Sequence, residues 1–203
     1  MRRRYVIATI VLTFVVGPLV SAQTRSIDVT RSRMTVHAFK SGLFSAFGHD
    51  HVIQAPIEQG QVRTQEPAAI EFVIDSRRLK VLDPDLPANK RAEVQRTMHS
   101  ADVLDSERLP EIRFSSGSVE QAGADRWKVR GLLVVRGRAS EVVADVAEQN
   151  GAYRGSAKIK QRDFGIKPVS VAGGTIKVKD ELLIEFEIAL VTTETVTAHK
   201  AER

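Results

Sequence analysis

The strongest constraint in this sequence is the alternation of apolar and polar residues within short segments that are separated by turn-forming residues. In one such segment, Ile70, Phe72 and Ile74 alternate with residues that include Glu71 and Asp75. A period of two indicates half-buried β-strands, because successive side chains of a strand point to opposite faces of the sheet. The pattern recurs at residues 111–114, 127–136, 141–147, 153–160 and 177–190. We therefore expect an all-β protein.

The connections between these segments favour a closed barrel. Gln121–Asp125 and Gln149–Gly151 are rich in turn-forming residues, so we expect them to link neighbouring strands. About eight long strands joined by short turns fit an antiparallel barrel better than a sandwich, because closure removes the sheet edges that promote aggregation. The alternation is equally compatible with a barrel filled by side chains and with a hollow one that holds a small ligand.

One segment departs from the β pattern. Residues 88–99 contain good helix formers, with Asp85 as a candidate N-cap and Pro87 as an early proline. We expect one short helical insertion there, followed by a loop over Ser100–Leu109 that holds at most one further turn of helix. The polar tail at residues 194–203 is expected to fray.

The N-terminus has the three parts of a secretory signal peptide. Arginines at positions 2–4 precede an apolar run from Tyr5 to Val20, and the small residues Ser21 and Ala22 follow. We expect residues 1–22 to be removed, which would place the protein in the periplasm or outside the cell. The alternative, a membrane anchor, requires about 20 apolar residues, and this run is shorter. No later stretch is long and apolar enough to span a bilayer, so we expect no membrane span in the mature chain.

Composition excludes several classes of protein. Removing the three signal-peptide arginines from the 30 Lys and Arg leaves 27, against 25 Asp and Glu, so the mature chain is nearly neutral. This balance argues against nucleic-acid binding, and the cluster Arg77, Arg78 and Lys80 is interpreted as a solvated loop. The chain has no cysteine, which excludes disulfides and thiolate metal sites. A mature chain of about 180 residues can bury a core and predicts one domain, at residues 23–193.

A series of short motifs extends over nearly the whole mature chain. The motifs are Ser26–Val29, Ser32–Val36, His99–Phe114, Gly131–Gly137, Arg162–Ile166 and Asp180–Phe186. Their order resembles that of the YceI-like family of exported, lipocalin-like barrels. The segment Ser41–His51 departs from the commoner family pattern, and this departure leaves the identity of the cargo open.

The resemblance implies a barrel whose interior encloses an apolar isoprenoid lipid, either a polyprenyl chain or the tail of a quinone. Such a protein carries or stores its ligand without transforming it, and it requires no cofactor, because burial of an apolar tail needs no catalytic group. Strand alternation nominates nine side chains for the lining. They are Phe39, Phe72, Ile74, Phe114, Leu133, Val135, Phe164, Ile184 and Phe186.

Two other functions are kept as alternatives. His49 and His51 are two residues apart, so on an extended segment they would point the same way and could bind a metal ion, with His37 or His99 as a third ligand. The same histidines could instead hydrogen-bond a loop to the barrel. The second alternative is an interaction module with a solid core. A homodimer is left open.

Enzymatic function is not expected. The sequence has no Gly-x-Ser-x-Gly element and no glycine-rich phosphate loop. Asp163, Phe164 and Gly165 do not form a kinase motif, because the accompanying kinase elements are absent. Asp102 and Asp105 are interpreted as loop residues near the end of the helix.

Overall fold

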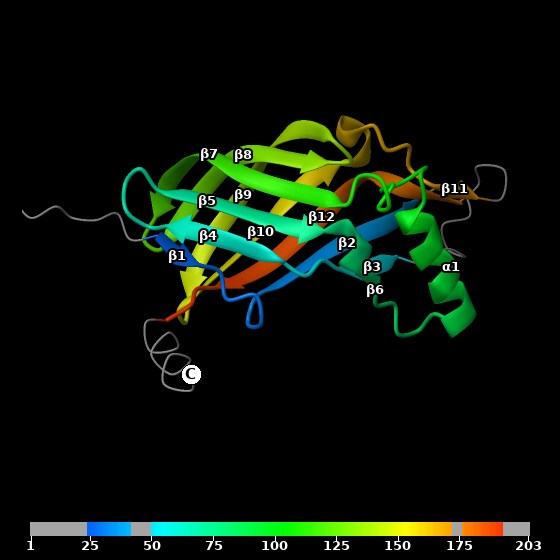
Figure 1. Cartoon of the computed structure of the whole chain (residues 1–203), viewed down its shortest axis with the longest axis horizontal. Coiled ribbons are helices and arrows are strands. Elements are labelled where there is room, and N and C mark those ends of the chain that lie inside the picture. The colour runs from blue at the N-terminus through cyan, green and yellow to red at the C-terminus, as the bar shows by residue number, and fades with distance from the viewer. Residues whose placement is uncertain (1–23, 42–49, 172–175, 193–203) are drawn as a thin grey trace, which may run out of the picture.

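Antiparallel strand pairing builds nearly the whole molecule. The computed structural model describes residues 24–41, 50–171 and 176–192, and in this part of the chain 12 strands form one curled sheet (Figure 1). The strand order is β1-β4-β5-β7-β8-β9-β10-β12-β2-β3-β6, with β11 paired to β12 outside this path. Most sequence neighbours are therefore also neighbours in the sheet, as expected for strands joined by short turns.

The strands are bounded as follows. They are β1 (Thr24–Ser26), β2 (Arg33–Ser41), β3 (His51–Gln54), β4 (Gln59–Arg63), β5 (Ala69–Asp75), β6 (Lys80–Val81), β7 (Glu111–Gly123), β8 (Arg126–Val135), β9 (Arg138–Gln149), β10 (Ala152–Lys160), β11 (Ser170–Val171) and β12 (Ile176–Ala189). The helical elements are α1 (Ala88–His99) and the short 3-10 turns η2 (Ser76–Arg78) and η3 (Gln161–Phe164).

The segment that contains β3 and β4 joins the two sides of the curled sheet. Its first part pairs with β2, and its second part pairs with β5. Between them, the backbone N–H of Ala55 donates to the carbonyl of Met34 at 2.9 Å, and that of Glu58 donates to the carbonyl of Val73 at 2.9 Å. One continuous stretch of chain thus changes partner strands and closes the wall.

A second contact closes the opposite end of the sheet. Ile27, just after β1, forms an antiparallel bridge with Leu190, just after β12. The backbone N–H of Asp28 also donates to the carbonyl of Ala189 at 2.8 Å. Because β1 pairs with β4 at the same time, these contacts connect β4 to β12.

The predicted all-β antiparallel barrel is confirmed, but the number of strands is higher than the expected value of about eight. β1, β6 and β11 contain 3, 2 and 2 residues. Strands this short show no alternation that sequence reasoning could detect. In addition, β3 and β4 are two strands because the chain changes partners between them.

The predicted turns lie where expected. β7 and β8 are joined at Ala124 and Asp125, and Asp125 has a positive φ of 52°. β9 and β10 are joined by Asn150 and Gly151, whose φ values are 53° and 75°. Two positive φ values in a two-residue hairpin loop are typical of a type I′ turn, for which Asn-Gly is a favoured sequence.

The predicted helix is observed at residues 88–99, but its predicted cap is wrong. Pro87 occupies the N-cap position, and no side chain makes a capping hydrogen bond. Asp85 lies two residues earlier, outside the cap position from which a carboxylate bonds the first helical N–H groups. The residues after the helix form hydrogen-bonded turns, including one in which Asp105 N–H donates to the carbonyl of Ser100 at 2.8 Å.

Glycines make room for phenylalanine rings inside the sheet. Gly155 pairs with Phe186 across β10 and β12, and a Cβ at Gly155 would lie 2.6 Å from Phe186 Cζ and 2.3 Å from the carbonyl oxygen of Asp145. Gly131 lies diagonally across from Phe114 between β8 and β7, and a Cβ at Gly131 would lie 2.6 Å from Phe114 Cζ. Both rings therefore lie against the backbone of a neighbouring strand, where any other residue would collide with them.

We predict that Gly155→Ala lowers the free energy of unfolding by about 1–3 kcal/mol, because the added methyl group overpacks a site bounded by backbone. Gly117→Ala is the matched control, since a Cβ there would meet nothing closer than 4.0 Å. Urea denaturation of both variants and the parent protein measures the difference. Equal stability of the two variants would contradict the proposed packing.

Candidate functional site

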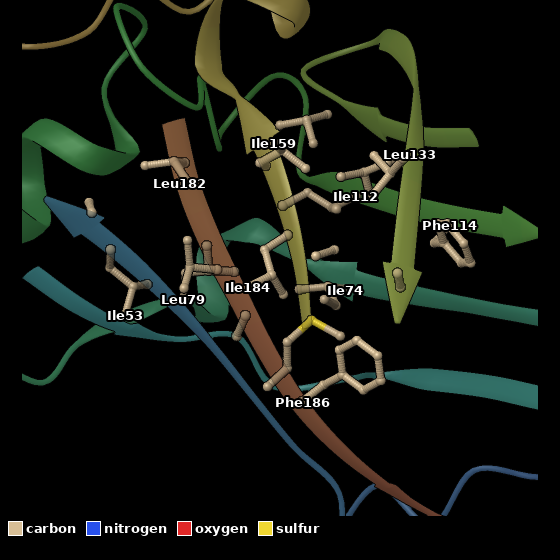
Figure 2. Close-up of a pocket in the computed structure, with 18 of the residues that line it drawn as sticks. Ile53, Ile74, Leu79, Ile112, Phe114, Leu133, Ile159, Leu182, Ile184 and Phe186 are labelled. Atoms are coloured by element: carbon tan, nitrogen blue, oxygen red, sulfur yellow. The ribbon is translucent and has the colours of Figure 1, made fainter. Parts of the chain in front are cut away.

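The barrel encloses an apolar cavity of about 590 Å³. Figure 2 shows side chains from several strands facing this space, among them Ile53 of β3, Ile74 of β5, Leu133 of β8 and Ile184 of β12. A volume of this size is typical of small-molecule sites, which occupy about 300–1,000 Å³. The hollow interior contradicts the solid-core alternative.

Most of the predicted lining residues border the cavity. They are Phe72, Ile74, Phe114, Leu133, Val135, Phe164, Ile184 and Phe186. Phe164 is the most deeply buried, at 1% exposure. Their contact with a ligand remains a prediction, whereas their position in the cavity wall is a property of the fold.

Phe39 was wrongly predicted to line the cavity. Val36 and Ala38 of the same strand border the cavity, so the alternation of β2 directs Phe39 to the other face. There its ring stacks with His37 at a centroid distance of 6.4 Å, and Lys179 Nζ lies 5.9 Å from the ring centroid. Apolar residues occur on both faces of β2, and in this strand the larger side chain points outward.

Aromatic side chains shape the cavity away from the helix. Phe72 of β5 and Phe114 of β7 are stacked with ring centroids 5.3 Å apart. Trp127 of β8 and Tyr153 of β10 meet edge to face at 5.9 Å. Burial raises the pKa of the Tyr153 phenol above its ordinary value, because a charged phenolate is poorly solvated there.

Polar residues that border the cavity gather at the end that α1 covers. They are Lys40, His51, Lys90, Glu93, Thr97, Gln161 and Lys177. Toward the opposite end, the polar groups of the described lining are those of Arg63, Thr64, Trp127 and Tyr153. The cavity therefore has a polar end, defined by the seven residues above, and an interior that is almost wholly apolar.

His51 and Asp83 form a buried pair at the polar end. His51 Nδ1 lies 2.6 Å from Asp83 Oδ2, and Asp83 Oδ1 accepts a hydrogen bond from the backbone N–H of Val52 at 2.8 Å. Asp83 is only 7% exposed, while the His51 side chain is 18% exposed. The pair thus holds the imidazole in a defined orientation at the edge of the cavity.

Helix α1 forms part of the cavity wall and is attached to β6 through one side chain. Val94 and Met98 border the cavity. Gln95 Oε1 accepts from the backbone N–H of Val81 at 2.7 Å, and Gln95 Nε2 donates to the carbonyl of Leu79 at 2.7 Å. The amide thereby bonds the backbone N–H of Val81 in β6 and the backbone carbonyl of Leu79 just before it.

We predict that Gln95→Ala lowers the free energy of unfolding by about 1–3 kcal/mol, because it leaves a buried N–H and a buried carbonyl without partners. Arg96→Ala is the control, since Arg96 is an exposed residue of the same helix. Chemical denaturation compares the two variants. If Gln95→Ala is as stable as Arg96→Ala, the amide does not anchor the helix.

The described residues do not assemble the metal site considered as an alternative. They contain no group of three His, Asp or Glu side chains that could hold a metal ion. His37 Nε2 lies 2.8 Å from Glu185 Oε2 on the outer face, and His99 Nδ1 bonds Ser106 Oγ at 3.0 Å. His49 lies outside the described residues, so metal binding by His49 and His51 stays a prediction.

Asp102 and Asp105, the acidic residues near the end of α1, do not border the cavity. Asp105 forms an ion pair with Arg108, with Asp105 Oδ2 and Arg108 Nη2 2.6 Å apart. The hydrogen bond from Arg108 lowers the pKa of the Asp105 carboxyl. Asp102 is an exposed residue of the same turn. Both residues belong to the loop after α1, as interpreted from the sequence.

Sequence reasoning missed several residues of the site. Asp83 lies in a turn that contains Asp and Pro, and nothing in that turn marks it as a site residue. It is 32 residues from His51 in the chain, so no local pattern links the two. Gln95 resembles an ordinary helix residue. Ala144 and Ala157 border the cavity and face each other across β9 and β10. Their small size is part of what keeps the interior open.

The comparisons with known proteins identify the family. A model of the YceI-like domain matches residues 21–190. This match covers most of the 203 residues, so the chain belongs to the YceI-like family. No curated protein matches the chain.

Two solved structures are similar in fold. BcnA of Burkholderia cenocepacia is 18% identical, with a TM-score of 0.63, and the match covers 82% of this chain and 99% of that protein. A polyisoprenoid-binding domain of Saccharophagus degradans, described as implicated in plant cell wall breakdown, is 13% identical, with a TM-score of 0.53. That match covers 80% of this chain and 95% of the domain. At these identities, the likeness establishes the fold.

In the described part of the chain, no helix has the length and apolar character needed to cross a membrane.

Proposed function

We propose that this YceI-like protein binds an apolar isoprenoid chain, either a polyprenyl lipid or the tail of a quinone, inside its barrel. It carries or stores this ligand without transforming it. The observation that supports the proposal best is the apolar cavity of about 590 Å³ inside the curled sheet. A second support is the division of the cavity into an apolar interior and one polar end, which matches a molecule with a long tail and a small head.

Packing energetics favour an occupied cavity. Apolar side chains that face an empty space have no partner atoms on that side and lose dispersion contacts. An apolar molecule that fills the space restores those contacts, so ligand binding and folding stability are expected to be coupled.

A branched hydrocarbon chain can supply the affinity without charged contacts. Burial contributes about 0.8 kcal/mol per methylene-sized group, or about 4 kcal/mol for a five-carbon isoprene unit. Association costs about 4–15 kcal/mol in lost translational and rotational freedom. A few buried isoprene units therefore exceed this cost. The printed description of the similar Saccharophagus degradans domain supports the choice of an isoprenoid chain.

Export is part of the proposal. The arginines at positions 2–4 and the apolar run that follows are typical of a signal peptide, with cleavage after Ala22. A periplasmic or secreted carrier would bind a lipid that is insoluble in the surrounding water. N-terminal sequencing of the protein recovered from its native host tests the cleavage site, and a mature protein that begins at Met1 would contradict it.

Native mass spectrometry tests the proposed ligand directly. We expect the purified protein to retain a small molecule, and organic extraction to release a species with isoprenoid mass increments. Ala157→Phe should reduce retention, because the new ring enters the cavity that Ala157 borders. Lys158→Phe is the matched control, since Lys158 is exposed on the adjacent position of the same strand.

The two variants separate loss of the cavity from loss of the fold. Unfolding curves of both variants establish that each is folded. Equal retention by Ala157→Phe and Lys158→Phe would contradict a ligand inside the barrel. A protein that releases no lipid and binds no added polyprenol would contradict the proposed function.

A further inference from the structure

We propose that His51 is a recognition residue for the head of the ligand, and that its Nε2 atom accepts a hydrogen bond from a hydroxyl group at the end of the bound apolar chain. The hydroxyl could belong to a prenyl alcohol or to a hydroquinone. This inference rests on the proposed function, because it assumes that an apolar tail occupies the cavity.

Asp83 determines which nitrogen of His51 is left for a ligand. Asp83 Oδ2 lies 2.6 Å from His51 Nδ1, and its other oxygen is occupied by the backbone N–H of Val52. A carboxylate accepts hydrogen bonds and does not donate them, so the imidazole proton resides on Nδ1. In the neutral ring, Nε2 then carries a lone pair and acts as an acceptor.

The position of His51 places its imidazole at the cavity wall, whereas Asp83, the partner of Nδ1, does not border the cavity. His51 and Ile53 lie on the same face of β3, and both border the cavity. Among the described residues, none makes a hydrogen bond to His51 Nε2, whereas Nδ1 is bonded to Asp83. The imidazole thus presents one unused polar atom at the polar end of an otherwise apolar space.

Attachment of the loop at Asp83 does not require the imidazole. The backbone N–H of Val52 already donates to Asp83 Oδ1 at 2.8 Å, and the backbone N–H of Leu82 donates to the carbonyl of Val52 at 2.8 Å. These two bonds hold the loop against β3. The Nε2 atom is therefore not needed to attach the loop.

The chemistry of Nε2 selects the type of head group. A lone-pair acceptor requires a ligand that donates a proton, as an alcohol or a hydroquinone does. A quinone carbonyl or an ether oxygen offers no such proton. If the head group fails to donate, the polar atom remains unpaired in a largely apolar site, which disfavours binding.

His51→Asn isolates this contact. The Asn side-chain amide can replace Nδ1–H as a donor to Asp83, but it has no atom at the position of Nε2. His51→Ala removes both contacts and serves as the comparison for stability. The binding of four probes is measured by isothermal titration or by competition with a fluorescent lipid, at mildly alkaline pH.

The probes form two matched pairs. Geranylgeraniol is compared with its methyl ether, and a short-tailed ubiquinol, kept reduced, is compared with the corresponding ubiquinone. We expect the parent protein to bind the hydroxyl form about three- to tenfold more tightly in at least one pair, which is the range that one hydrogen bond supplies. The pair that shows the preference identifies the source of the hydroxyl.

In His51→Asn, we expect this preference to disappear because the affinity for the hydroxyl probe falls, and we expect the affinity for the non-donating probe to stay the same or increase, because no unpaired Nε2 remains. Binding of all probes by the parent protein without any preference would overturn the inference and leave the proposed function intact. A preference that persists in His51→Asn would also overturn it. Failure of the parent protein to bind any of the four probes would instead contradict the proposed function itself.

Discussion

The structure depends on one feature of strand pairing, which is the change of partner within the stretch from β3 to β4. β3 pairs with β2 and β4 pairs with β5, so a single segment links strands from both sides of the curled sheet. The bridge between Ile27 and Leu190 adds a second closure at the opposite end. Closure satisfies backbone hydrogen bonds that open edges would leave exposed, and it converts one apolar face of a sheet into the wall of a cavity.

The size of the cavity follows from the distribution of large and small side chains on that wall. Phe114 and Phe186 lie against Gly131 and Gly155, so their rings follow the sheet instead of crossing the interior. Alanine at position 157 likewise leaves the centre open. A barrel of similar strand number with larger residues at these positions would fill its own core, because interiors pack to high density whenever side chains can reach one another.

The two ends of the cavity differ in chemistry, and this difference gives the proposed ligand an orientation. Trp127 and Tyr153 lie in the part distant from α1, while His51 lies at the end that α1 covers. A tail would occupy the aromatic region, and a polar head would remain beside the imidazole. Helix α1 is held to β6 largely through the amide of Gln95, so the polar end is bounded by an element with few buried anchors.

The sequence by itself determined the all-β class, the turns at Asp125 and Asn150, and the helix at residues 88–99, because periodicity and turn chemistry are local properties of the chain. It also placed eight of the nine proposed lining residues on the cavity wall, since alternation assigns faces to strands. Tertiary structure alone decided that Phe39 points outward, because apolar residues occur on both faces of β2 and only pairing with β3 and β12 sets its direction. It likewise decided that the barrel is hollow and that Asp83 meets His51 from 32 residues away. Both depend on the distance between opposite walls and on loop placement, which no local pattern encodes.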